Sequence, residues 1–109
     1  MRIAVAGSSG LIGSQVCRLA GEAGHEVVRL SRTDGVDLLD PDAVAKALVG
    51  VEAVVDVSRP SRMDLASARE FFTTVARNLG AAGREAGVRR TVVLSIVGVD
   101  RGQDYDWYV

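Results

Sequence analysis

The chain has few of the residues from which disulfides and metal sites are built, and it lacks a net positive charge. Cys17 is its single cysteine and His25 its single histidine among 109 residues. One cysteine can form neither an internal disulfide nor a cysteine-based metal site, so we expect no metal centre. The formal net charge is only -1, which gives no long-range attraction for polyanions. Nucleic acid is therefore not an expected partner.

Long apolar runs are also lacking. Residues 1–7 are apolar over too few positions for the core of a signal peptide, and no stretch is long enough to span a bilayer. We therefore expect a soluble, cytoplasmic protein without a membrane partner. The length suits one domain, and the 48% of residues that are hydrophobic can supply one core. A single domain over residues 1–109 is the expected organisation.

Short apolar segments alternate with stretches of helical periodicity. Strands are predicted over residues 2–6, 27–30, 53–57 and 90–95, and helices over 11–23, from 41 to about 48, and over 65–86. Continuous apolar runs are typical of strands covered on both faces, and the alternation favours a parallel sheet with right-handed crossovers. A third strand around residues 36–38 could only be vestigial, because too few residues precede it for a crossover helix. The sequence predicts an α/β fold of three layers, with helices on both faces of the sheet.

The segment between the first strand and the first helix is rich in glycine. It is Gly7-Ser8-Ser9-Gly10-Leu11-Ile12-Gly13. The start of a helix exposes unpaired N–H groups and partial positive charge, so a diphosphate can bind there if the backbone approaches it without intervening side chains. Gly7 and Gly10 would allow that approach, and Gly13 would let the helix pack tightly on the sheet. Ser8 or Ser9 could add a hydroxyl donor. The alternative is a tight turn whose glycines serve backbone geometry alone.

With these residues the chain resembles the short-chain dehydrogenase/reductase superfamily. It is most similar to the atypical NAD(P)H-binding branch, which includes NmrA-like proteins and sugar-nucleotide epimerases and reductases. The resemblance covers the whole chain and implies a Rossmann-type fold. The motifs that carry it are the glycine loop, Leu30-Ser31-Arg32, Val36-Asp37-Leu38-Leu39-Asp40, residues 53–58, and Leu94-Ser95-Ile96-Val97-Gly98-Val99-Asp100. The glycine spacing, G-x-x-G-x-x-G, is one residue longer between its first two glycines than the usual dinucleotide fingerprint. Because the full fold uses two strand-helix halves, we expect the sheet to be truncated after its fifth strand.

The resemblance also implies where a dinucleotide would lie. Asp37 would accept a hydrogen bond from the exocyclic amino group of the adenine, and Leu38 would cover the ring. The alternative for Asp37 is that it starts the next turn. Val57 and Ser58 end a strand, where ligands gather in open α/β sheets. Arg59 would reach the diphosphate or else point into solvent.

The end of the second strand bears on the choice of cofactor. A carboxylate there is typical of NAD sites, whereas arginine is typical of sites for the 2′-phosphate of NADP. Here Ser31 and Arg32 follow the strand, and this favours NADP over NAD. The alternative for Arg32 is an ordinary exposed charge. Asp34 lies nearby and weakens the preference for NADP.

Catalysis rests on a less complete pattern. Carbonyl-reducing members of the superfamily resemble one another in a strand-end serine, which Ser95 matches, and in a tyrosine with a lysine four residues later. Tyr105 is followed at that spacing by Val109, so it fails the pattern, and Tyr108 remains the candidate proton donor. The non-catalytic alternative for Ser95 is a structural hydroxyl at the end of a strand.

Two functions therefore stay open. One is an NADP-dependent oxidoreductase, or an epimerase, whose unknown small-molecule substrate is bound by residues beyond this chain. The other is a non-catalytic, redox-sensing regulator that binds NADP without turnover. An open sheet edge and the aromatic residues after position 104 also lead us to expect self-association into a homo-oligomer.

Overall fold

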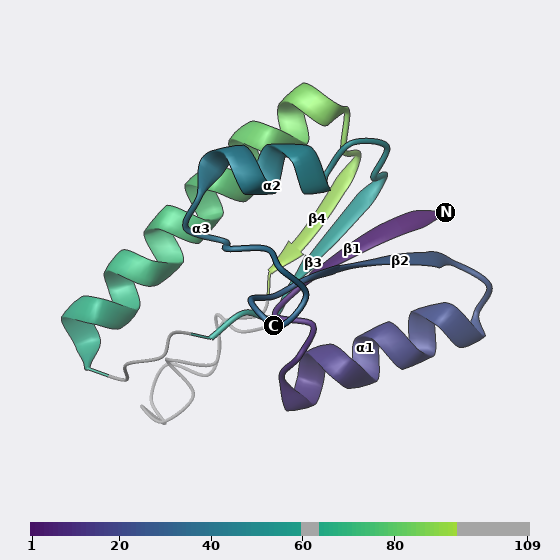
Figure 1. Ribbon diagram of the computed structural model, residues 1–109, viewed down its shortest axis with the longest axis horizontal. Helices are drawn as coiled ribbons and strands as arrows, with labels where there is room; N and C mark the ends of the chain where they lie inside the picture. Colours follow the sequence, from purple (N-terminus) through teal and green to yellow (C-terminus); the bar gives the residue numbers. More distant parts are fainter. Residues whose placement is uncertain (60–63, 94–109) are drawn as a thin grey trace, which may run out of the picture.

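A parallel sheet between two helical layers forms the body of the protein (Figure 1). The computed structural model describes residues 1–59 and 64–93. The strands are β1 (Arg2–Ala6), β2 (Glu26–Leu30), β3 (Ala53–Asp56) and β4 (Arg90–Val93), and they lie side by side in the order β2-β1-β3-β4. Helix α1 (Leu11–Glu22) lies on one face, and helices α2 (Pro41–Ala47) and α3 (Leu65–Ala86) lie on the other. The predicted three-layer α/β fold is confirmed.

The two faces of the sheet bury alternate residues of the same strands. Ala4, Ala6 and Val54 belong to the larger core, which α2 and α3 cover. Val5 packs with Cys17 of α1 in a second, smaller core on the opposite face. Period-two alternation sends successive side chains to opposite faces, so an apolar residue is needed at every position. This is the physical reason for the unbroken apolar runs of the central strands.

The ends of the helices follow the local chemistry of the sequence. Helix α3 has the predicted bounds, and Gly87 ends it in the left-handed conformation at φ +81°. Asp40 caps α2 by accepting the N–H groups of Asp42 and Ala43. Asp64 caps α3 in the same way. Of the predicted final strand, residues 90–93 form β4, and residues 94–95 lie outside the described part of the chain.

No strand forms around residues 36–38, where only a vestigial one was expected, so residues 90–93 are the fourth strand of the described sheet and not the fifth. Residues 36–38 belong to a turn that leaves β2, in which the N–H of Val36 donates to the carbonyl of Ser31. The two apolar side chains that suggested a strand have another role, because Leu38 is buried in the larger core and Val36 packs against it. The N–H of Val36 therefore bonds within the turn and the carbonyl of Leu38 bonds to the side chain of Asn78 in α3, so neither group pairs with the sheet.

We predict opposite effects for alanine at two glycines of α1. A Cβ on Gly13 would lie 1.9 Å from the carbonyl oxygen of Gly7, a backbone atom with little room to move. Gly13→Ala should therefore lower the free energy of unfolding by about 3 kcal/mol or more. A Cβ on Gly21 would meet nothing within 4 Å. Gly21→Ala should raise stability by about 0.5–1 kcal/mol, because alanine favours the helix. Urea unfolding measures both, and equal stability of the two variants would contradict the packing described here.

Candidate functional site

The glycine loop lies directly against the residues that follow β3. Gly7 has φ +86°, which L side chains rarely adopt, and a Cβ there would come within 2.7 Å of the Cα of Ser58. Gly13 packs closely against the carbonyl of Gly7, which is possible only because Gly13 has no side chain. The end of β1, Ser58 and the first turn of α1 therefore meet at one point. This point lies at the carboxyl edge of the parallel sheet.

The start of α1 is open, unlike the starts of the other two helices. Its N-cap, Gly10, makes no side-chain hydrogen bond, and the first turn contains no acidic residue. Leu11 is 77% exposed and Ile12 is 39% exposed. A Cβ on Gly10 would meet only the carbonyl of Gly7, at an ordinary 3.4 Å, so packing alone does not demand glycine there. The first-turn N–H groups of α1 are thus left for an anion.

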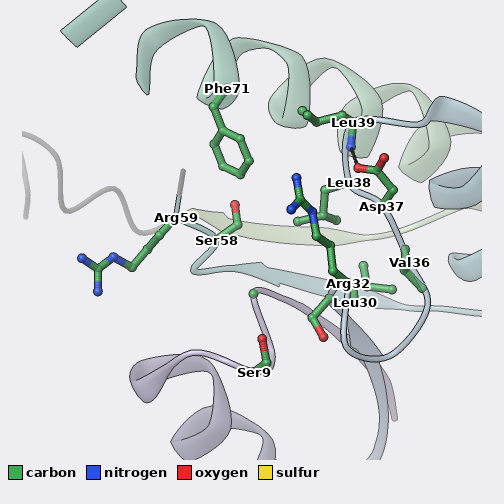
Figure 2. A pocket seen from close by; sticks show the side chains of 12 residues that line it. Ser9, Leu30, Arg32, Val36, Asp37, Leu38, Leu39, Ser58, Arg59 and Phe71 are labelled. Atoms are coloured by element: carbon green, nitrogen blue, oxygen red, sulfur yellow. Dashed lines mark hydrogen bonds between the residues drawn. The ribbon is translucent and has the colours of Figure 1, made fainter. Parts of the chain in front are cut away.

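A pocket of about 260 Å³ opens beside the glycine loop. It is bounded by that loop, by the turn after β2, by the residues after β3 and by one side chain of α3 (Figure 2). The predicted residues that line it are Gly7, Ser9, Ser31, Arg32, Asp37, Leu38, Ser58 and Arg59. The predicted site did not include Leu30, Val36, Leu39 and Phe71. Phe71 packs against the larger core and also lines the pocket.

Other predicted residues shape the site without lining the pocket. Gly10, Leu11, Ile12 and Gly13 form the start of α1 beside it. Ser8 and Val57 are buried behind it, at 1% and 7% exposure. Ser95 and Tyr108, the two catalytic candidates, lie outside the described residues.

The two arginines that line the pocket are oriented differently. Figure 2 shows the guanidinium of Arg32 directed into the ring of lining side chains, whereas Arg59 extends away from it. Asp37 lines the same pocket, and one of its carboxylate oxygens accepts the N–H of Leu39 at 3.0 Å. Asp37 therefore holds the turn in shape, as its alternative role required, and also faces the pocket.

Asn78 fixes the turn that forms one wall of the pocket. It is 8% exposed, and its amide nitrogen donates to the carbonyl of Leu38 at 2.9 Å. This links α3 to the segment after β2. The sequence analysis did not single out Asn78. Its position on the apolar stripe of α3, between Val75 and Leu79, could have indicated a buried polar residue with a structural role.

Three serines around the pocket donate their hydroxyl protons to carboxylates. Ser31 and Ser8 both donate to the same oxygen of Asp34, at 2.7 and 3.0 Å. The hydrogen bond from Ser31, and then that from Ser8, hold the pKa of Asp34 below its ordinary value. Ser58 donates to the buried carboxylate of Asp56 at 2.6 Å. Ser31 and Ser58, which line the pocket, are therefore held by carboxylates that do not line it.

The described residues contain neither a membrane-spanning helix nor a cluster of metal-binding side chains. In residues 1–59 and 64–93, no helix is both long and apolar enough to cross a bilayer. Over the same ranges, no three side chains of histidine, cysteine, aspartate or glutamate gather in a way that could hold a metal ion.

With the geometry established, the chain can be compared with known proteins. Residues 3–99 match the NAD dependent epimerase/dehydratase family. The chain belongs to this family. Membership in the epimerase/dehydratase family confirms the resemblance to the short-chain dehydrogenase/reductase superfamily and the Rossmann-type fold.

Individual proteins and solved structures are also similar to this epimerase/dehydratase chain. Photosystem II assembly factor Ycf39 of Synechocystis sp. is 30% identical over 111 residues, which cover 89% of this chain and 34% of that protein. The 2-alkyl-3-oxoalkanoate reductase of Stenotrophomonas maltophilia is 39% identical over 66 residues, covering 50% of this chain and 20% of that protein. A short-chain dehydrogenase/reductase superfamily protein from Agrobacterium tumefaciens, solved with bound NAD, is 28% identical with a TM-score of 0.69, covering 85% of this chain and 32% of that one. The chain thus spans about a third or less of the length of each of these three proteins.

We predict that Asn78→Ala loosens the turn after β2. The substitution leaves the carbonyl of Leu38 without its donor, which should cost about 1–3 kcal/mol of stability. Exposed Thr73 on the same helix is the matched control, and Thr73→Ala should change stability by less than about 0.5 kcal/mol. Thermal or urea unfolding tests both. Two equally stable variants would show that the bond from Asn78 does not brace the turn.

The contribution of Asp34 to stability should depend on pH. Its pKa is lower in the folded protein than in the unfolded chain, so its carboxylate stabilises the fold above about pH 4, the unfolded value. This stabilisation should fade as the pH falls through the lower folded value. The unfolding free energy of the wild type minus that of Asp34→Asn should therefore be larger at neutral pH than near about pH 2.5. The pKa of Asp64 is also lowered, but Asp64 is present in both proteins and cancels. A pH-independent difference would contradict the assignment.

Proposed function

We propose that this chain binds NADP in a Rossmann-type site and is the cofactor-binding part of an oxidoreductase. The observation that carries the proposal is the pocket that Arg32 enters, because its lining includes Gly7 and Ser9, which directly precede the uncapped start of α1. An open helix start suits a diphosphate, and an arginine at the end of β2 suits a 2′-phosphate. We propose residues 1–109 as one NAD(P)-binding domain.

The residues suit successive parts of a dinucleotide. In the proposed binding mode, the first-turn amides of α1 and the glycine loop take the diphosphate. Leu38 and Phe71 offer apolar surface to the adenine, and Asp37 offers its carboxylate to the exocyclic amino group. Arg32 takes the 2′-phosphate. Ser58 lies across the pocket from these residues, where the chain turns away from β3.

The choice of NADP rests on this chain rather than on its relatives. The Agrobacterium protein was solved with NAD. Here, however, the residue after Ser31 is an arginine directed into the pocket. Its planar guanidinium can bind a phosphate through two parallel hydrogen bonds. The arginine supports NADP, with NAD as the weaker ligand.

Hydride transfer is proposed on narrower grounds. The nicotinamide ring supplies or accepts the hydride when the cofactor is bound. The similarity to a reductase of Stenotrophomonas maltophilia supports an oxidoreductase. Ser95 and Tyr108 remain the predicted catalytic residues, and a homo-oligomer remains the predicted assembly. Oxidation of NADPH by a carbonyl substrate, followed at the nicotinamide absorbance band, distinguishes an oxidoreductase from a redox-sensing regulator.

The binding test uses Arg32→Gln. Titration calorimetry of the purified protein should show NADPH binding weakened about tenfold or more, since a charge-assisted pair to phosphate is lost. The affinity for NADH should change less than about threefold, because NADH lacks the phosphate.

Arg18→Gln is the matched control for that test. Arg18 is an exposed arginine of α1 whose ion pair with Glu22 spans 3.3 Å, and it does not line the pocket. Its removal should leave both affinities unchanged. If well-folded wild-type protein binds neither nucleotide, the proposed function fails. If Arg32→Gln weakens both nucleotides equally, the preference for NADP fails.

A further inference from the structure

Asp34 is an exposed residue beside the pocket, and its carboxylate accepts hydrogen bonds from two hydroxyl groups. Asp34 does not line the pocket, whereas Ser31 does. One oxygen of Asp34 accepts the hydroxyl protons of both Ser31 and Ser8. Because these bonds lower the pKa of Asp34, its carboxyl group is ionised at neutral pH and has no proton to give back. The direction of both hydrogen bonds is thereby fixed.

The hydroxyl of Ser31 consequently has little bonding capacity left. A serine hydroxyl has one proton and two lone pairs. Asp34 takes the proton at 2.7 Å, and the backbone N–H of Asp34 donates to the same oxygen of Ser31 at 3.3 Å. One lone pair is left for a ligand. Ser31 can therefore accept a hydrogen bond from a bound molecule but has no proton to donate to it.

This matters because the two nicotinamide cofactors differ at the adenosine ribose. NAD carries a 2′-hydroxyl there, which can donate to a lone pair. NADP carries a 2′-phosphate, which is anionic and needs donors. Ser31 thus suits NAD, whereas its neighbour Arg32 suits NADP. The charge of Asp34 adds to this opposition, since it lies well within the screening length of physiological salt, about 8 Å, from the hydroxyl it binds.

We propose that Asp34 is a specificity-determining residue that acts through Ser31 and limits the preference for NADP that Arg32 provides. Asp34 is a positioning residue, because it sets the hydrogen-bond direction of a group that touches the cofactor. The site is then a dual-cofactor site. This inference rests on the proposed function and adds to it the means by which the two cofactors are balanced.

The experiment compares NADPH and NADH dissociation constants for Asp34→Ala, Ser31→Ala and the double variant, at about 0.15 M salt. Asp34→Ala frees the Ser31 proton for the 2′-phosphate, so the preference for NADPH over NADH should rise about tenfold. Ser31→Ala removes the acceptor of the ribose hydroxyl, so NADH should bind several-fold more weakly while NADPH changes little. In the Ser31→Ala background, removing Asp34 should shift the preference much less than in the wild type. Non-additivity of this kind shows that the two residues act together.

A charge control accompanies these variants. Glu85 is an exposed carboxylate near the carboxyl end of α3, and Glu85→Gln should leave the preference unchanged. An unchanged preference in Asp34→Ala overturns the inference while NADP binding itself stands. An equal shift with and without Ser31 also overturns it, because charge alone would then be the cause. If Asp34→Ala does not fold, Ser31→Ala still decides, since unaltered NADH binding there contradicts the role of Ser31. Absence of binding by the wild type overturns the proposed function first.

Discussion

The structure depends on the approach of one backbone segment to another at the carboxyl edge of the sheet. Gly7 lies so near the backbone of Ser58 that any side chain would overlap it, and a side chain on Gly13 would overlap the backbone of Gly7 still more. These contacts hold the ends of β1 and β3 against the start of α1. The same lack of side chains leaves the helix start bare. Tight packing and an exposed helix start therefore have a single cause in the glycine loop.

The remainder of the pocket is shaped by polar side chains that do not face a ligand. Asn78 holds the carbonyl of Leu38, and buried Asp56 holds Ser58. Asp34 ties the glycine loop to the turn after β2 through Ser8 and Ser31. Fully satisfied networks of this kind specify one arrangement of the backbone. The turn after β2, which has no regular secondary structure, thereby becomes a fixed wall.

Local patterns in the sequence were sufficient for the layers, for the bounds of α3 and for the position of the glycine loop. Helical periodicity and capping depend on residues only a few positions apart, so they are visible in one sequence. The ties that shape the pocket are not local. Asn78 and Leu38 are 40 positions apart, and Ser8 and Asp34 are 26 apart. Val36 and Leu38 look like part of a short strand in the sequence for a related reason. Their side chains are apolar because they pack in the larger core, and not because their backbone pairs in a sheet.

The order of the strands has a consequence for the growing chain on the ribosome. Of the four described strands, β1 is made first, and it lies between two others and must find partners along both edges. Arg2 pairs with Glu26 of β2 on one side. On the other side Ile3 pairs with Ala53 of β3, which is synthesised later. During that interval β1 and β2 form only a two-stranded ribbon, which is marginally stable alone. The nascent segment thus has an unprotected edge until β3 emerges, and that is the stage of synthesis at which mispairing with a neighbouring chain is most favoured.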